Sequence, residues 1–230
     1  MKCIVLKKRS IIIVLSIIVT ASIVMTLFSL LDAKPVMSAA YNMPITGIKT
    51  DDKQVALSIN VYENTDIDSI LELLGDTKAT FFVSEAFDNL RGVKVSQIAS
   101  LGHDVGILED NMRGKTRKEI NDRLAERVER LSFLAGKPCD LIRFNNNGFD
   151  SGCIDAVFSL GLYPVQWSTD DSVGSYSQGD IILVSEENKA GEFIKKLTAD
   201  GFRIETVDGI ILKRNYTIDS GGEQRLLITE

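Results

Sequence analysis

The residues that could bind a metal ion are few and lie apart in the sequence. The chain has one histidine, His103, and three cysteines, whereas catalytic zinc generally needs three protein ligands, most often including imidazoles. Two carboxylate pairs, Glu109-Asp110 and Asp170-Asp171, follow apolar segments, and such oxygen ligands suit Ca²⁺, Mg²⁺ or Mn²⁺ rather than zinc. We interpret both pairs as solvated acidic loops and His103 as a structural residue. The prediction is therefore that no metal or other cofactor is bound.

Residues 53–66 predict a buried strand that runs into a loop and then a helix. Apolar residues alternate with smaller or polar ones over 55–59, which is the period of a β-strand. Thr65 is a suitable N-cap for the helix, and a second apolar segment, 78–84, predicts the next strand. This order gives a right-handed βαβ unit, in which function sits at the C-terminal ends of the strands. The residues expected at that edge are Ser58, Asn60 and Val61.

Strand and helix signals continue to alternate along the rest of the chain. Further strands are expected at 103–108, 141–144, 163–170, 180–185 and 202–207. Helices are expected at 95–102, 120–134, 153–161 and 190–199, and a last strand pair turns at Gly221-Gly222. Strands that alternate with helices predict a parallel sheet. The predicted fold class is therefore α/β.

The outer face of the helix at 120–134 carries regularly spaced charges. Glu119 and Arg123, like Glu126 and Arg130, are four residues apart, the spacing at which side chains meet on a helix surface. We interpret this face as solvated and salt-paired rather than as a binding patch.

The N-terminal part of the chain differs in character from the rest. Residues 11–31 are apolar and uncharged, long enough to span a bilayer. A secretory signal is the alternative, because residues 38–40 could be a cleavage site, but signal cores are usually shorter, roughly 7–15 residues. The predicted organisation is a membrane anchor or signal segment at 1–32, a linker at 33–50 and one domain at 51–230. The domain is expected outside the cell membrane on a single-pass anchor, or secreted.

Net charge also divides near this boundary. Residues 1–40 carry +4 and residues 41–230 carry −10, which together give −6 for the chain. An acidic exported domain is a poor partner for nucleic acid or anionic lipid. A neutral sugar polymer is compatible with this charge, so the expected partners are an envelope glycan or an envelope protein.

Two segments carry a resemblance to a known family. The sequences KQVALSIN, from Lys53, and KATFFVSEAF, from Lys78, resemble the opening of the polysaccharide deacetylase (NodB homology) domain, a metal-dependent carbohydrate esterase. That domain has an irregular (β/α) barrel, which the resemblance implies here for about residues 50–210. Its first strand normally ends in two aspartates, the catalytic base and a metal ligand. Their positions fall on Asn60 and Val61.

The other family motifs are altered in the same way. The segment 102–106 matches the family's Gly-His-Glu-Ile-Gly strand start, so the two metal-binding histidines that follow it correspond to Leu108 and Met112. The histidine that supplies the catalytic acid corresponds to Ser185. Arg143 and Asp170 keep their family identities. The family would use a divalent metal such as zinc, and this chain lacks the residues to hold one.

Several further roles follow from the aligned segments. Trp167, Asn145 and Asn146 are candidates for glycan binding, although turn chemistry and core packing are alternatives for them. Cys139 and Cys153 could form a disulfide in an oxidising compartment, or be two buried apolar residues. If the barrel is kept, Arg143 and Asp170 should form an ion pair at its mouth, with Asn60 hydrogen-bonded to it.

These observations favour an exported, membrane-anchored, polysaccharide-deacetylase-like domain that is catalytically inactive and binds a cell-envelope glycan of the peptidoglycan type. One alternative is a divergent active deacetylase that hydrolyses the N-acetyl C–N bond of an amino-sugar polymer. A second is a structural module that binds a protein, because a fold by itself does not fix a function.

Overall fold

A computed structural model describes residues 43–172, 175–185 and 190–227. They belong to one compact unit, residues 37–230. Among these residues no helix is long and apolar enough to cross a membrane. The predicted anchor at 11–31 lies outside the described residues.

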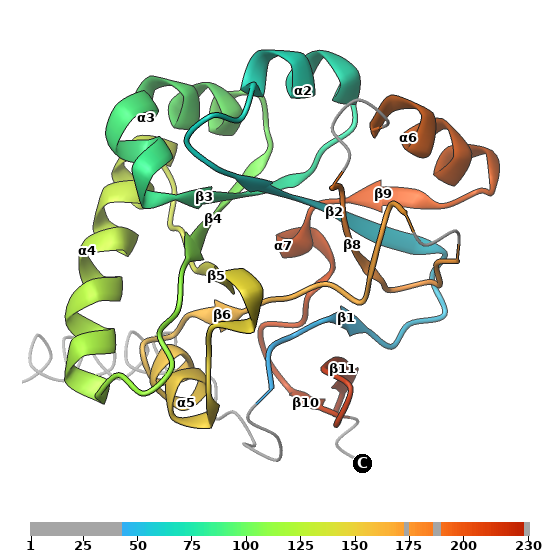
Figure 1. Cartoon of the computed structure of the whole chain (residues 1–230). Coiled ribbons are helices and arrows are strands. Elements are labelled where there is room, and N and C mark those ends of the chain that lie inside the picture. The colour runs from blue at the N-terminus through green and yellow to red at the C-terminus, as the bar shows by residue number, and fades with distance from the viewer. Residues whose placement is uncertain (1–42, 173–174, 186–189, 228–230) are drawn as a thin grey trace, which may run out of the picture. The chain divides into compact units, whose positions relative to one another are not determined.

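A curled parallel sheet forms the centre of the domain (Figure 1). Its strands run in the order β6-β5-β4-β3-β2-β8-β7, and β9 also pairs with β2. Their bounds are β2 Gln54–Val61, β3 Thr80–Ser84, β4 Asp104–Glu109, β5 Leu141–Phe144, β6 Tyr163–Pro164, β7 Thr169–Asp170, β8 Ile181–Leu183 and β9 Arg203–Glu205. Every pairing in this sheet is parallel. The predicted α/β barrel is confirmed.

Helices cover the outer side of this sheet (Figure 1). They are α2 Ile67–Leu74, α3 Glu85–Ser100, α4 Arg117–Ala135, α5 Ser151–Ser159 and α6 Ala190–Ala199, with a 3₁₀ turn at Asn145–Asn147. The short α7, Val207–Ile210, packs instead against residues inside the barrel. Its first N–H donates to the Thr80 hydroxyl at the start of β3 (2.8 Å). Helix α7 therefore fills the N-terminal end of the barrel.

The alternation along β2 explains how one strand serves both sides of the sheet. Val55, Leu57 and Ile59 belong to the core between the sheet and the helices, whereas Ala56 belongs to a second core inside the barrel. Burial on both faces makes the strand apolar almost throughout, as parallel sheets require. The polar residues of β2 are Gln54 at its start and Ser58 and Asn60 near its end, all on the same side as Ala56.

The ends of the helices follow from local capping chemistry. Thr116 caps α4 in a capping box with Glu119, and Gly136 ends the helix in the left-handed region (φ 68°), which glycine adopts without strain. The cap of α2 is Asp66, whose carboxylate accepts the Ser69 N–H. The prediction of Thr65 for this cap was therefore wrong by one residue.

Three predicted boundaries differ from the structure. The helix expected at 95–102 is the end of a longer helix, α3, which begins at Glu85 and ends at Ser100. The predicted linker at 33–50 contains Ile45, which is fully buried, and β1, Gly47–Ile48, which pairs with β11. The domain therefore begins before residue 51, because the apolar residues of this segment complete a second sheet. That sheet has the order β1-β11-β10 and contains the expected strand pair, β10 Tyr216–Ile218 and β11 Glu223–Leu226. The strand expected at 163–170 is divided into β6 and β7.

Candidate functional site at the barrel mouth

The C-terminal ends of β2, β3, β4 and β5 lie at one edge of the sheet, which we call the barrel mouth. The parallel register aligns Val61 with Val83, Ser84 with Leu108, and Glu109 with Phe144. The predicted functional edge is therefore a real edge of the fold.

Arg143 on β5 points into the barrel beneath this mouth. Its side chain is fully buried, and its guanidinium lies over the rings of Phe82 (4.0 Å to the centroid) and Trp167 (5.2 Å). Gly106 on β4 makes room for Phe82, since a Cβ there would meet the phenyl ring at 2.7 Å. Burial lowers the pKa of Arg143 to about 9, which still leaves the side chain charged at neutral pH.

The hydrogen bonds of Arg143 go to neutral groups. Nη1 donates to Asn60 Oδ1 (3.0 Å), and Nη2 donates to Ser58 Oγ (2.9 Å) and to the Gln166 carbonyl (3.5 Å). Nε is buried without a partner. The predicted hydrogen bond between Asn60 and Arg143 is present.

The predicted ion pair between Arg143 and Asp170 is wrong. Asp170 Oδ1 instead accepts from the N–H and the hydroxyl of Ser172 (2.9 and 2.5 Å). A short side chain at the end of β7 satisfies the backbone of its own turn more readily than a guanidinium deeper in the barrel, because aspartate bonds to the N–H two residues ahead.

The positions that correspond to the family's metal ligands are apolar and buried. Val61, Leu108 and Met112 are 0%, 3% and 2% exposed. None of them has a side-chain atom that binds zinc well, so these residues do not fit the metal. Within the described parts of the chain, no group of three or more histidine, cysteine, aspartate or glutamate residues could hold an ion.

Ser185, at the position of the family's catalytic acid, contacts a carboxylate rather than a substrate group. Its N–H and hydroxyl both donate to Asp171 Oδ1 (3.1 and 2.5 Å). A serine hydroxyl is a poor proton donor at neutral pH, so this pair fixes the loop after β8 and does not supply an acid.

A polar cavity of about 500 Å³ lies beside the mouth, where the segments after β4 and β5 meet. Its lining is Asp110, Asn111, Arg113, Asn145, Asn146, Asn147 and Gly148. Two of the asparagines, Asn146 and Asn147, have positive φ (50° and 53°), a conformation that asparagine tolerates better than most residues. The half-exposed Tyr62, after β2, donates to Asn145 Oδ1 (3.2 Å). The structure thus places Asn145 and Asn146 in a cavity, whereas Trp167 packs against Arg143.

A buried ion-pair network, which the sequence did not predict, lies between the mouth and helices α3 and α4. Arg127 is 2% exposed and pairs with the buried Asp88 and with Glu109 Oε1 (3.1 Å). Its Nη2 also donates to the Val83 carbonyl (2.9 Å). Arg130 Nε binds the other oxygen of Asp88 (2.8 Å).

This network corrects two predictions. Arg123 binds Glu109 (3.2 Å) and Glu85 (2.6 Å) rather than Glu119, so the predicted salt-paired outer face of α4 instead holds the helix against α3 and β4. Glu109 is 3% exposed and does not belong to a solvated loop. The four-residue spacing of opposite charges obscured this, because it is also typical of exposed helix faces.

His103 and the two cysteines are buried structural residues. His103 Nδ1 accepts the Ala79 N–H (3.2 Å), and burial lowers its pKa to about 4, so the ring is neutral at physiological pH. Cys139 and Cys153 are free. The disulfide considered for them is not formed, because Cys139 Sγ lies against the Val105 carbonyl (2.9 Å) and Cys153 packs in the core beneath α5.

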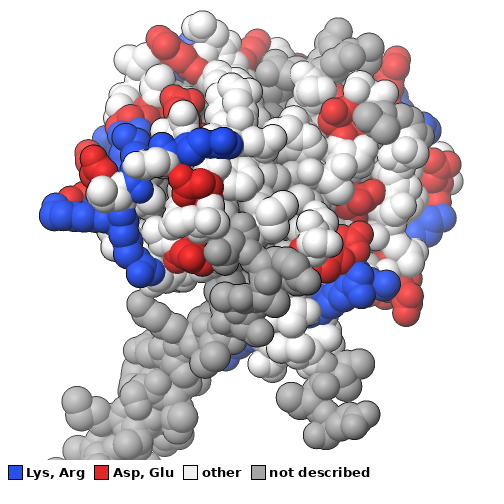
Figure 2. Space-filling view, turned by 60° about the horizontal axis from the view of Figure 1, so that its bottom comes forward, with Lys and Arg blue, Asp and Glu red and all other residues white. Residues whose placement is uncertain are grey.

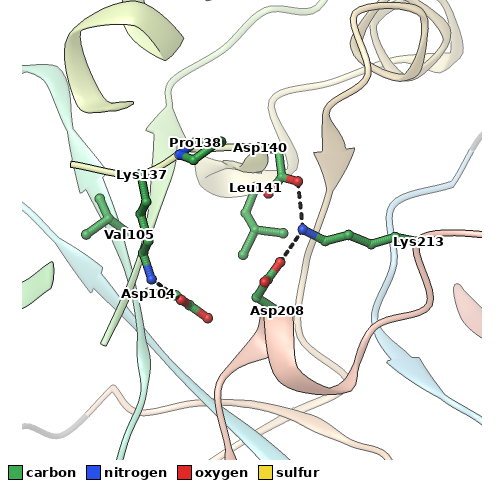
Figure 3. A pocket seen from close by; sticks show the side chains of 8 residues that line it. All are labelled: Asp104, Val105, Lys137, Pro138, Asp140, Leu141, Asp208 and Lys213. Atoms are coloured by element: carbon green, nitrogen blue, oxygen red, sulfur yellow. Dashed lines mark hydrogen bonds and ion pairs between the residues drawn. The ribbon is translucent and has the colours of Figure 1, made fainter. Parts of the chain in front are cut away.

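A second cavity, of about 320 Å³, opens where β4 and β5 begin, at the opposite edge of the sheet from the mouth (Figure 3). Lys213 contacts both Asp140 (2.7 Å) and Asp208 there, and Lys137 binds Asp104 (2.6 Å). At this end of a barrel, paired charges serve stability rather than chemistry.

The face of the molecule in Figure 2 shows acidic and basic side chains interspersed rather than gathered by sign. No continuous basic surface is visible on that face. This pattern differs from the single-signed patch that nucleic-acid binding uses.

The fold and the mouth define a (β/α)-barrel protein with polar and buried charged residues at the C-terminal ends of its strands. Comparison with solved structures identifies this barrel as the family 4 carbohydrate esterase fold. A CE4 family pseudoenzyme from Bacillus anthracis, BA3943, superposes with a TM-score of 0.67 at 20% identity over 76% of this chain and 70% of its own. A mutant of BA3943 with restored enzymatic activity gives the same TM-score at 19% identity, over 76% of this chain and 73% of its own.

Active enzymes share the fold as well. The Bc1960 peptidoglycan N-acetylglucosamine deacetylase has a TM-score of 0.67 at 20% identity, over 74% of this chain and 94% of its own. The chitin deacetylase of Colletotrichum lindemuthianum has a TM-score of 0.61 at 19% identity, over 73% and 91%. No family model matches the sequence, and no curated protein matches it. The predicted resemblance to polysaccharide deacetylases is confirmed for the fold.

Proposed function

We propose that this chain is a membrane-anchored, exported domain that binds an N-acetylated envelope glycan at the barrel mouth without hydrolysing it. The observation that carries the proposal is the set of side chains at the mouth. Asn60 occupies the position of the base and is hydrogen-bonded to Arg143, and the metal-ligand positions are buried and apolar. An amide cannot accept a proton from water near neutral pH, so this geometry supports binding rather than hydrolysis.

The fold neighbours support the ligand class. Two of them are a peptidoglycan N-acetylglucosamine deacetylase and a chitin deacetylase. The Asn-lined cavity beside the mouth supplies amide donors and acceptors, and the half-exposed ring of Tyr62 supplies an apolar face. Ligand sites combine apolar and aromatic surface with a few placed polar groups, and amide donors and acceptors can pair with the N-acetyl groups of such a polymer.

The test is a pair of measurements on the full chain purified in a neutral detergent. Binding to peptidoglycan and to N-acetylglucosamine oligomers is measured by co-sedimentation and calorimetry, and acetate release is measured with added zinc, manganese or cobalt. We expect binding without acetate release. Tyr62→Ala and Asn145→Ala should weaken binding at least tenfold, whereas Glu72→Ala, in a separate cavity beside α2 and α6, is the matched control.

Two results would contradict this proposal. Metal-dependent acetate release would show a divergent active deacetylase, and equal binding by all three variants would place the ligand elsewhere. Asn60→Asp by itself should not release acetate, because Leu108 and Met112 leave no metal site and Ser185 leaves no acid. The anchor is tested separately: the full chain should stay with membranes after alkaline extraction, and a soluble form that begins near residue 41 would show cleavage.

A further inference from the structure

Among the residues that the structure describes, the guanidinium of Arg143 is a buried cation with no carboxylate partner. Its hydrogen-bond acceptors are an amide oxygen, a hydroxyl and a backbone carbonyl, and its Nε has none. A buried charge normally has an opposite charge beside it, because desolvation of an unpaired ion is unfavourable by several kcal/mol. The site therefore has one positive charge more than its protein partners neutralise.

Asn60 lies between this cation and the solvent with its amide held in one orientation. Because Oδ1 accepts from Arg143 Nη1 (3.0 Å), the side chain turns its other end, Nδ2, away from the guanidinium. Nδ2 has no partner among the described residues and is not among the buried unpaired atoms, so solvent or a ligand reaches it. The mouth thus presents an N–H donor directly in front of a buried positive charge.

None of the described carboxylates at this edge is hydrogen-bonded to Arg143. Asp110, directly after β4, accepts from Asn145 Nδ2 (3.5 Å) in the adjacent cavity. Asp170 and Asp171 accept hydrogen bonds from Ser172 and Ser185 on the β7 and β8 side of the mouth. Glu109 is engaged by Arg123 and Arg127. An acceptor with its own negative charge is therefore the chemistry that complements Asn60 Nδ2 and Arg143 together.

We propose that the barrel mouth binds a carboxylate, which accepts a hydrogen bond from Asn60 Nδ2 and provides the counter-charge of Arg143. A sugar acid within a glycan and a small free carboxylate share this chemistry. In the first case the inference rests on the proposed function and narrows its ligand to an acidic saccharide. The adjacent Asn-lined cavity, which Tyr62 joins to the mouth through Asn145, then takes the neighbouring sugar.

The test uses the full chain in neutral detergent and three probes at one ionic strength. Glucuronate carries a carboxylate on a sugar ring, glucose is the matched neutral sugar, and acetate is the free carboxylate. We expect calorimetry to give a Kd for glucuronate at least tenfold below that for glucose. Binding of glucuronate without acetate assigns the site to a sugar acid, and equal binding of both assigns it to a small carboxylate.

Two variants test the position of the bound carboxylate. Asn60→Asp places a fixed carboxylate on Arg143, so it should lower the affinity for glucuronate at least tenfold. Arg143→Met should do the same by removing the charge, and Lys118→Met, at an exposed ion pair, should leave the affinity unchanged. Equal affinities for glucose and glucuronate, or an Asn60→Asp variant that binds glucuronate as the parent does, would overturn the inference.

The two proposals can fail separately. Binding of neutral N-acetylglucosamine oligomers without preference for a carboxylate would keep the proposed function and overturn this inference. Binding of acetate without binding of any glycan would overturn the proposed function and keep this inference.

Discussion

Arg127 and Arg143 are both buried at the C-terminal half of the same sheet, yet their surroundings differ. Arg127, on α4, contacts two carboxylates, Asp88 and Glu109, and lies where the helices cover the sheet. Within the described residues, Arg143, on β5, contacts neutral polar atoms and two aromatic rings. The first arrangement is a neutralised structural network. The second is a buried cation whose hydrogen-bond acceptors are an amide oxygen, a hydroxyl and a backbone carbonyl.

The two arginines therefore have different tasks: the network of Arg127 serves stability, whereas the surroundings of Arg143 leave room for a ligand. The network around Arg127 fixes α3 and α4 against β4, and its loss would leave charges stranded inside the domain. At the mouth, the positions that the resemblance assigns to metal ligands and to the base hold apolar or neutral side chains. On the same strands, therefore, the residues that hold the fold together are different from the residues that line the mouth.

Removal of the Arg127 charge should have the largest effect on stability. Arg127→Met leaves the carboxylates of Asp88 and Glu109 buried with fewer partners, so we expect the free energy of unfolding to fall by about 3–5 kcal/mol. Urea denaturation at pH 7 measures this. Lys118→Met on the same helix is the matched control, since its ion pair with Asp122 is exposed, and its midpoint should not move. A small effect of Arg127→Met would show that Arg130 and Arg123 suffice for the two acids.

His103 offers a third way to bury a basic side chain, which is to release the proton. Its folded pKa is about 4 against about 6.5 when unfolded, so the unfolded state binds more protons between these values. The contribution of neutral His103 to the free energy of unfolding should be fully present above pH 6.5. It should be lost as the pH falls toward 4, by at most about 3 kcal/mol. The NMR titration of this single histidine measures the folded pKa directly. A folded pKa near 6.5 would contradict the prediction, and His103→Gln should remove this part of the pH dependence.

Restoring a carboxylate at the mouth should stabilise the domain. Asn60→Asp gives Arg143 a charge-assisted hydrogen bond in place of a neutral one, for which we expect a gain of about 1.5–3 kcal/mol at pH 7. Arg143 should hold the pKa of the new carboxylate below its unfolded value of about 3.9. The gain is therefore present above pH 3.9 and lost as the pH falls through the folded pKa. Urea midpoints of parent and variant across this range measure it, and an unchanged midpoint at pH 7 would show that Arg143 already has a counter-charge.

The comparison also shows what could be predicted from the sequence. The strand–helix alternation and the two family-like segments predicted the barrel, the edge where its strands end and the contact between Asn60 and Arg143, because these depend on local periodicity and parallel register. The ion network was missed, because Asp88, Glu109 and Arg127 lie far apart in the sequence. The partner of Asp170 was predicted wrongly, because a bond to its own turn replaced a long-range ion pair.

The smallest effect is expected from removal of the Arg143 charge. Arg143→Met takes away a cation that has no carboxylate partner, and a flexible apolar side chain can pack against Phe82 and Trp167 in its place. The groups it leaves behind keep other partners: Ser58 Oγ still donates to the Ile182 carbonyl (3.0 Å), and Asn60 reaches solvent. Replacement of a buried charge by an apolar group of similar volume is often neutral or stabilising, so we expect the free energy of unfolding to change by less than about 1 kcal/mol. The same urea denaturation measures this beside Arg127→Met. A loss as large as that of Arg127→Met would mean that the mouth neutralises Arg143 after all, and the distinction between the two buried arginines would fail. A near-neutral result that coincides with lost carboxylate binding would show that Arg143 is kept for a ligand and not for the fold.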